Sequence, residues 1–199
     1  MRIELTRAAL RLSQRVMFAG AFSLLGYCCF VLVNSWLFQG RQRLEFERLI
    51  ADGPPHAGGS LAPVSTPIVS GGLVGRIEIP SLSFSAILIE GTTRETLQRA
   101  VGHIAGTARP GQAGNVGISG HRDTFFRPLR HIHRDDLITL TTLDGRFNYR
   151  VVSMRVVDPS EVSVLEGGKG ESLTLVTCYP FYFVGPAPDR FVVHAERLM

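Results

Sequence analysis

Three side chains of this 199-residue chain could together carry out nucleophilic catalysis. Cys178 follows the apolar run 173–177 and precedes a Tyr-Pro pair, so its thiol is predicted at a strand end, where catalytic groups commonly lie. A thiol attacks well only as thiolate, and an adjacent imidazole is the usual means of activating it. His121 closes another apolar run and fits that role. Arg190 begins the last predicted strand, and a guanidinium beside Cys178 would stabilise the oxyanion formed when a thiolate attacks a carbonyl.

Each of these residues also has a structural interpretation. Cys178 could be an inert core thiol, and His121 could be a satisfied surface histidine. Arg190 could pair at the surface with Asp189 or Glu196, which are close to it in the sequence. The spacing of the residues does not by itself decide between catalysis and structure.

The elements that must position these residues are predicted to be mostly strands. From Gly75 onward, short apolar runs are broken by Gly, Pro and Asp at close intervals, which is typical of an all-β barrel or sandwich. One helix is expected at 92–100, opened by Thr92 with Glu95 three positions later. A mostly antiparallel closed β-structure is therefore predicted. The predicted strands are 75–79, 84–89, 115–119, 137–141, 146–157, 173–177 and 190–195.

The N-terminal part is predicted to anchor the chain in a membrane. Residues 16–40 contain no charged side chain, and about 20 apolar residues suffice to cross a bilayer core. The segment is too long for a signal-peptide core and has no small-residue cleavage site at its end, which indicates an uncleaved signal anchor. A buried helix of a soluble domain is the alternative, but such a helix normally carries a polar stripe. Arginines before the segment outweigh its single acidic neighbour Glu4, which favours a cytoplasmic N-terminus.

Four segments follow from this organisation. They are a basic cytoplasmic tail (1–15), a transmembrane signal anchor (16–40), a juxtamembrane helix with a Pro/Gly/Ser linker (41–72) and a catalytic domain (73–199). Cys28 and Cys29 fall within the anchor, so Cys178 is the one cysteine of the exported domain. An unpaired cysteine in an oxidising compartment is either reactive for a reason or buried and inert.

The net charge of +4 does not indicate a nucleic-acid partner. Residues 1–49 hold seven Arg and three Glu, whereas residues 50–199 hold fourteen basic and fourteen acidic side chains. The globular part is thus neutral and lacks the basic patch that phosphate binding requires. No nucleic-acid partner is expected.

Two other functions compete with thiol catalysis. Residues 131–136 (HIHRDD) partly imitate the HxHxDH metal site of metallo-β-lactamase-like hydrolases. The motif ends in Asp136, no apolar strand precedes it, and only His194 supplies a later imidazole, so a zinc shell is hard to assemble. No metal and no cofactor are expected. A membrane-tethered β-domain that only scaffolds a partner is the other alternative, and it would leave the combination of Cys178, His121 and Arg190 unexplained.

Three motifs, taken in order, resemble the sortases. They are residues 120–124 (GHRDT), 174–178 (TLVTC) and 190–193 (RFVV). The resemblance also includes residues 101–103 (VGH) with Gly106 and Thr107, and it covers essentially all of residues 75–198. The CYPF continuation after residue 177 and the GPAPDR approach to Arg190 look most like the sortases of Gram-negative bacteria, with class D enzymes next.

This resemblance implies a sortase-type closed β-barrel of about eight strands with one or two short helices. It implies Cys178 as nucleophile, His121 as general acid and base, and Arg190 as ligand of the substrate or oxyanion. Thr177 would orient the site and His103 would support it. Sortases are transpeptidases that cut an LPxTG-type sorting signal near the C-terminus of a secreted protein and pass the thioacyl product to an amine. The expected location is the bacterial inner membrane, with the domain outside the cytoplasm and periplasmic in a Gram-negative cell.

The chain departs from the family pattern at residues 134–136, where Arg-Asp-Asp stands in place of an expected Gly-Asp pair. This puts a local loop in doubt and leaves the chemistry intact. No acidic cluster occurs where class A enzymes bind calcium, so no calcium site is expected.

Overall fold

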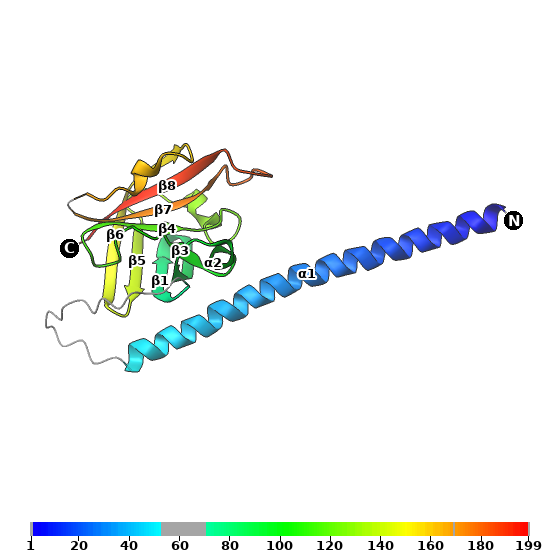
Figure 1. Cartoon of the computed structure of the whole chain (residues 1–199), viewed down its shortest axis with the longest axis horizontal. Coiled ribbons are helices and arrows are strands. Elements are labelled where there is room, and N and C mark those ends of the chain that lie inside the picture. Colours follow the sequence, from blue (N-terminus) through cyan, green and yellow to red (C-terminus); the bar gives the residue numbers. More distant parts are fainter. Residues whose placement is uncertain (1, 53–70, 169, 199) are drawn as a thin grey trace. The chain divides into compact units, whose positions relative to one another are not determined.

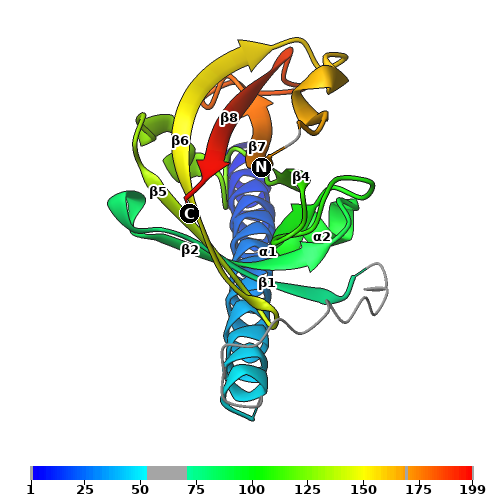
Figure 2. The ribbon, with the colours of Figure 1, turned by 90° about the vertical axis from the view of Figure 1, so that its left-hand side faces the viewer.

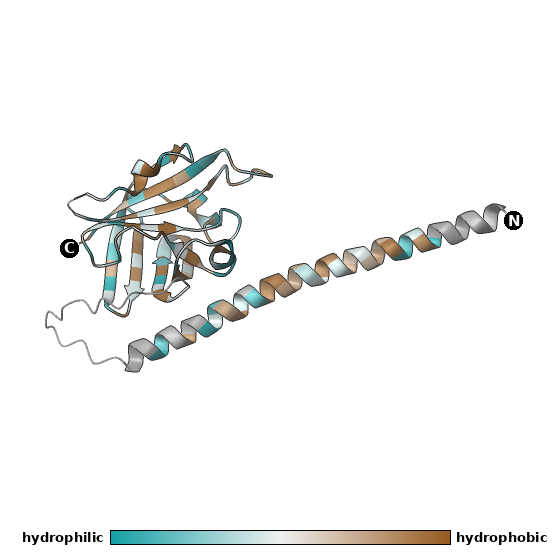
Figure 3. Cartoon of the chain, in the orientation of Figure 1, coloured by the Kyte–Doolittle hydropathy of each residue, from teal (hydrophilic) through white to brown (hydrophobic). Residues whose placement is uncertain are grey.

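The computed structural model describes residues 2–52, 71–168 and 170–198, which form an N-terminal helix and a β-barrel (Figure 1). Helix α1 runs from Arg2 to Asp52. Within it, the 31-residue stretch Arg11–Arg41 is apolar and long enough to cross a membrane. Figure 3 shows the apolar residues gathered along the middle of this helix. The stretch fits a single-pass membrane anchor.

The helix includes residues 41–50, which the sequence predicts to continue as a helix after the anchor. Most of the predicted linker falls at residues 53–70, outside the described residues. The bounds of the four predicted segments therefore stay a prediction. The chain divides after Gly40 into two compact units, of which the second contains the barrel.

Eight strands close a barrel in the order β1-β2-β3-β4-β7-β8-β6-β5, which confirms the predicted fold (Figure 2). The strands are β1 (Leu73–Ile79), β2 (Phe84–Glu90), β3 (Val101–His103), β4 (Gly114–Ser119), β5 (Leu137–Thr142), β6 (Gly145–Val157), β7 (Glu171–Tyr179) and β8 (Asp189–Arg197). The short helices are α2 (Arg94–Arg99) and the 3-10 turns η1 (Pro80–Leu82), η2 (Arg127–His131) and η3 (Val162–Leu165).

Two of the strand pairings are parallel, and one of them matters most for the site. β2 pairs with β3 and β4 pairs with β7 in parallel, whereas the other neighbours are antiparallel. In the β4–β7 pair, Ser119 lies opposite Val176. Because parallel strands point the same way, the C-terminal ends of β4 and β7 meet at one rim of the barrel.

Helix α2 is shorter than the helix predicted at 92–100. Its N-cap is Thr93, whose Oγ1 accepts a hydrogen bond from the Thr96 backbone N–H at 3.2 Å, so the cap lies one residue after the predicted Thr92. The helix ends at Arg99 because Ala100 already has extended backbone angles. Strand β3 follows at once, and its three residues are too few to show a periodic pattern in the sequence.

Each of the seven predicted strands coincides with an observed strand, but the observed strands are mostly longer by one or two residues at an end. The difference matters at Cys178, which was predicted to end its strand. β7 continues to Tyr179 because Cys178 and Tyr179 still pair with residues of β8. Cys178 is thus the last residue but one of the strand.

The turn before β5 explains the departure from the family pattern at residues 134–136. Asp135 has a positive φ of 68°, in the left-handed region where glycine is usual and aspartate is among the better tolerated residues. The Asp135 N–H donates to the Val151 carbonyl at 2.9 Å, and the Val151 N–H donates to the Asp136 carbonyl at 3.0 Å. The turn is therefore held on β6 without a glycine.

The barrel interior is apolar and tightly filled. Its fully buried side chains include Ile77, Leu88, Ile118, Leu140, Leu173, Leu175 and Val193, together with the aromatic rings of Phe126 and Tyr149. Burial of Tyr149 raises the pKa of its phenol to about 12, with Arg197 opposing the shift. Because successive residues of a strand point to opposite faces, the neighbours of these core residues on β7 and β8 face outward.

Candidate active site

Cys178 and Arg190 lie directly opposite each other across the β7–β8 ladder. Directly opposed residues in an antiparallel pair have Cβ atoms about 5 Å apart. Both side chains are half-buried, so the thiol and the guanidinium are sheltered but still within reach of solvent. The structure thus brings together two of the three residues singled out in the sequence, which are twelve positions apart in the chain.

His121 is brought to the same rim by the parallel pairing of β4 with β7. The Gly120 N–H donates to the Val176 carbonyl at 3.3 Å, which carries the pairing past the end of β4. The buried Thr177 Oγ1 donates to the Gly120 carbonyl at 2.7 Å. The residue before Cys178 therefore holds the peptide that precedes His121. This contact is what the predicted orienting role of Thr177 would require.

The thiol and the guanidinium share the outer face of the barrel. Thr174 on β7 and His194 on β8 contact each other, with Thr174 Oγ1 3.3 Å from His194 Nδ1. The next residue of β7, Leu175, is instead fully buried in the core. Alternate residues of a strand share a face. Cys178, four residues after Thr174, and Arg190, four residues before His194, therefore face the same outer side of the barrel as Thr174 and His194. The site is a rim site on the outside of the barrel wall.

The Arg190 side chain donates hydrogen bonds to two backbone carbonyls. Its Nη1 donates to the carbonyl of Asp189 at 2.9 Å and to that of Ala187 at 3.4 Å. Among the ion pairs of the described residues, none joins Arg190 to Asp189 or Glu196. The surface-pair interpretation of Arg190 thus has no contact to support it.

An aromatic cluster of Tyr179, Phe181 and Phe191 packs at the same ends of β7 and β8. The ring centroids of Phe181 and Phe191 are 5.3 Å apart, and those of Tyr179 and Phe181 are 5.9 Å apart. Phe181 and Phe191 also pack against the core. Tyr179 and Phe191 directly follow Cys178 and Arg190, so this packing fixes the backbone that carries both groups.

Gly120 allows the His121 segment to pass close to the core. A Cβ at Gly120 would lie 2.8 Å from the fully buried ring of Phe126, which is too close for any other residue without movement of the ring. The Phe126 N–H in turn donates to the His121 carbonyl at 2.9 Å. The chain thus needs glycine immediately before His121 for packing.

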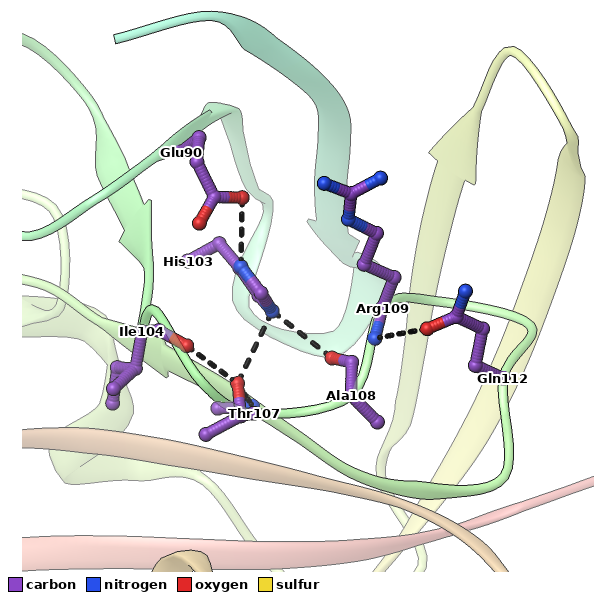
Figure 4. Close-up of polar contacts among 8 residues, drawn as sticks. Glu90, His103, Ile104, Thr107, Ala108, Arg109 and Gln112 are labelled. Atoms are coloured by element: carbon purple, nitrogen blue, oxygen red, sulfur yellow. Dashed lines mark hydrogen bonds and ion pairs between the residues drawn. The ribbon is translucent and has the colours of Figure 1, made fainter. Parts of the chain in front are cut away.

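His103 belongs to a buried polar network on the β3–β4 side of the barrel (Figure 4). Its Nδ1 lies 2.9 Å from Glu90 Oε2, and its Nε2 lies 2.9 Å from the Ala108 carbonyl and 3.1 Å from Thr107 Oγ1. Both ring nitrogens of His103 thus have polar partners. Thr107 Oγ1 also accepts from the Gly117 N–H at 3.0 Å, which ties the network to β4. This placement suits the predicted supporting role, which stays a prediction.

A second polar network holds the connection between β6 and β7 over the outer face. The Val164 carbonyl of η3 accepts from Asn115 Nδ2 at 3.1 Å, and Thr174 Oγ1 donates to Asn115 Oδ1 at 2.9 Å. Next to it is a pocket of about 230 Å³. Ser153, Arg155, Ser163, Val164, Glu166, Val192 and His194 line it. The pocket lies on the β6–β8 side, beside the rim site rather than at it.

The position of His194 in this network predicts a dependence of stability on pH. Burial lowers the pKa of His194 below its ordinary value of 6.5, Glu196 opposes the shift and Arg155 adds to it. The unfolded chain therefore takes up this proton first as the pH falls, and the free energy of unfolding should decrease below about pH 6.5. We expect His194→Gln to weaken this decrease, measured by urea unfolding between about pH 5 and pH 7.5. Identical pH slopes for the two proteins would contradict it.

The residues of the possible metal motif do not assemble into a site. His131 Nε2 accepts from Arg130 Nε at 2.8 Å, and the His133 N–H donates to Asp136 Oδ2 at 2.8 Å. His194 lies on β8, in the network just described. Among the described residues, no three His, Cys, Asp or Glu side chains lie together as a metal site would need. The geometry gives the metallohydrolase alternative no support.

Two features of the site escape sequence reasoning. The aromatic cluster of Tyr179, Phe181 and Phe191 is visible in the sequence only as scattered rings, because its contacts form across two strands. The second feature is Arg122, which belongs to the GHRDT motif but has no role predicted from the sequence. Its adjacency to His121 was the available signal.

Comparisons with known proteins agree with this geometry. A family model described as Sortase domain matches residues 77–198. Sortase D of Bacillus subtilis (strain 168) is 31% identical over 188 residues, which cover 90% of this chain and 94% of that protein. Sortase A of Listeria monocytogenes is 33% identical over 113 residues, and the chain spans 49% of its length.

Among solved structures, a Clostridium perfringens Sortase D5 transpeptidase superposes with a TM-score of 0.61 at 31% identity, covering 66% of this chain and 82% of that one. Two of the three relatives thus carry class D names, the class that the sequence ranks second. The first-ranked Gram-negative class stays a prediction.

Proposed function

Because this chain belongs to the sortase family of cysteine transpeptidases, we propose that it cleaves an LPxTG-like sorting signal near the C-terminus of a secreted protein. The cleaved protein is then transferred to an amine acceptor. The observation that carries this proposal is the rim of the barrel, where Cys178 faces Arg190 and the end of β4 delivers His121.

In the first half of the reaction, the Cys178 thiolate attacks the carbonyl carbon of the scissile peptide bond. The Arg190 guanidinium stabilises the negative charge that develops on the carbonyl oxygen. His121 gives a proton to the leaving amine, the carbon–nitrogen bond breaks, and a thioester on Cys178 remains. The outward-facing position of the thiol supports this step, since an extended peptide can reach it from solvent.

In the second half, the acceptor amine attacks the thioester carbonyl. His121 takes the proton from the attacking amine, a new peptide bond forms, and Cys178 leaves as the thiolate. Thr177 contributes through its hydrogen bond to the Gly120 carbonyl, which restrains the backbone of His121 in both halves of the cycle. No metal or cofactor takes part in this scheme.

The experiment that tests the proposal is to trap the thioester. The full chain in detergent is mixed with a peptide carrying an LPxTG-type signal, and the intact mass is measured with and without hydroxylamine. We expect an acyl adduct on Cys178 that hydroxylamine releases as a hydroxamate, and cleavage that is insensitive to chelators. Cleavage that a chelator abolishes, with no adduct, would favour the metallohydrolase instead.

We further propose that α1 spans the bacterial inner membrane once and places the barrel outside the cytoplasm. The apolar stretch Arg11–Arg41 and the arginines before it support this orientation. A membrane-impermeant maleimide should label Cys178 in intact cells once any outer membrane is permeabilised, while lipid shields Cys28 and Cys29. Labelling of Cys178 only after the inner membrane is lysed would reverse the orientation.

A further inference from the structure

Arg122, the residue after His121, reaches across to the connection between β7 and β8. We name residues 180–188 the β7–β8 loop. Arg122 Nη1 donates to the Pro180 carbonyl at 3.2 Å, and its Nη2 donates to the carbonyls of Phe183 and Gly185, each at 2.8 Å. Its guanidinium carbon also lies 5.9 Å from the centroid of the Phe183 ring, within cation–π range. One side chain therefore contacts three carbonyls of the loop.

Hydrogen bonds join the segments that carry His121 and Cys178 both before and after these two residues. On one side, Thr177, the residue before Cys178, donates to the carbonyl of Gly120, the residue before His121. On the other side, Arg122 after His121 donates to Pro180 beyond Cys178. The segment with His121 and the strand with Cys178 are thus tied together both before and after the pair.

Phe181 anchors the start of the β7–β8 loop on the core, but residues 182–186 beyond it are exposed. The β7–β8 ladder ends at the pair Tyr179–Asp189, so the Cys178–Arg190 pair is the last but one. Beyond it, Val184 is 96% exposed and Tyr182 is 76% exposed, although Arg130 lies over the Tyr182 ring at 5.5 Å. The ends of a ladder fray when the loop beyond them is free to move. Fraying here would displace both Cys178 and Arg190.

We propose that Arg122 is a positioning residue that holds the β7–β8 loop on the His121 segment. It thereby keeps the side chains of Cys178, His121 and Arg190 in their relative positions. The inference rests on the proposed function of these three residues. Arg122 acts through the loop and touches no reacting atom. A planar guanidinium with several fixed donors can serve three carbonyls at once, whereas the ammonium of lysine is a point charge on a flexible stem. Lysine should therefore restore only part of the effect.

The test compares Arg122→Ala and Arg122→Lys with Arg127→Ala, which removes an exposed arginine of η2 five positions along the same segment. In the full chain, kcat and KM are measured with the sorting-signal peptide. Misplacement by about 1 Å can cost on the order of 10²-fold in rate, so we expect kcat to fall on that scale in Arg122→Ala with a much smaller change in KM. Arg122→Lys should lie between, and Arg127→Ala should match the wild type.

Two further measurements need no substrate and separate this inference from the proposed function. Chymotrypsin under native conditions should cut after Tyr182 or Phe183 about tenfold faster in Arg122→Ala than in the wild type or Arg127→Ala. The rate at which iodoacetamide alkylates Cys178, followed against pH, should also change in Arg122→Ala. If the wild type turns over no sorting-signal peptide, the proposed function fails while these two measurements still decide the role of Arg122.

Unchanged loop cleavage in Arg122→Ala would overturn the inference. So would faster cleavage with an unchanged kcat and an unchanged alkylation profile, because the tether would then be structural only. If Arg122→Ala does not fold, Arg122→Lys carries the same comparison at a smaller amplitude.

Discussion

Cys178→Ala should abolish turnover of a sorting-signal peptide while the barrel stays folded. The thiol is half-buried at a rim and outside the core, so its removal should cost no more than about 1 kcal/mol of the free energy of unfolding. Its removal takes away the covalent route, and loss of a nucleophile costs on the order of 10⁶-fold in kcat in a well-studied protease. Peptide cleavage followed by mass spectrometry, together with thermal unfolding, measures both quantities.

The matched control for Cys178 is supplied by the chain itself. Cys28 and Cys29 lie in α1, far from the barrel in sequence, and the double variant Cys28→Ala/Cys29→Ala should retain wild-type turnover. Appreciable cleavage by Cys178→Ala would remove it as the nucleophile. Equal loss in the double variant would point to a general effect on the anchored protein instead.

Arg190→Ala should lower kcat by on the order of 10²- to 10³-fold with a modest change in KM, the usual scale for a donor that stabilises an oxyanion. The reason is its register position opposite Cys178, with its Nη1 already oriented by the carbonyls of Asp189 and Ala187. Arg190→Lys keeps the charge but loses the planar fork, so we expect only partial recovery. Steady-state kinetics on the same peptide gives the two parameters separately.

Arg150→Ala is a suitable control for Arg190, because Arg150 is an exposed arginine of β6 that pairs with Glu196 near the opposite end of the β6–β8 ladder. Its turnover should match the wild type. If Arg190 served only as a surface charge, both of its variants would change stability by about 0 to 1 kcal/mol and keep near-normal turnover. That result would exclude Arg190 from the site and leave Cys178 and His121 in it.

Most of the strands could be predicted because their signals are local. Apolar runs bounded by Gly, Pro and Asp mark β1, β2 and β4 to β8, whereas β3 is too short for any period to show. The helix cap was misplaced by one residue because Thr92 and Thr93 are both able to cap, and only the backbone angles select Thr93. The departure at Asp135 became intelligible only through its positive φ.

The chemical types of the candidate site residues could likewise be identified from sequence, since a lone exported cysteine, a motif histidine and a strand-initial arginine each stand out by type and position. Their roles came from the resemblance to sortases, and they remain proposals. The hydrogen bond from Thr177 to Gly120 and the tether from Arg122 to the β7–β8 loop could not be read from the sequence, because each joins residues more than fifty positions apart.

The sequence by itself thus determined which residues could react and which segments are strands, because side-chain chemistry and strand alternation are properties of short stretches. Only the tertiary structure decided that β4 runs parallel to β7 and that Cys178 faces Arg190 on the outside of the barrel. Strand register depends on pairing between distant segments, and a slip of one residue would turn every side chain of a strand to the other face. With β7 slipped by one position, the Cys178 thiol would point into the apolar core, where no peptide could reach it.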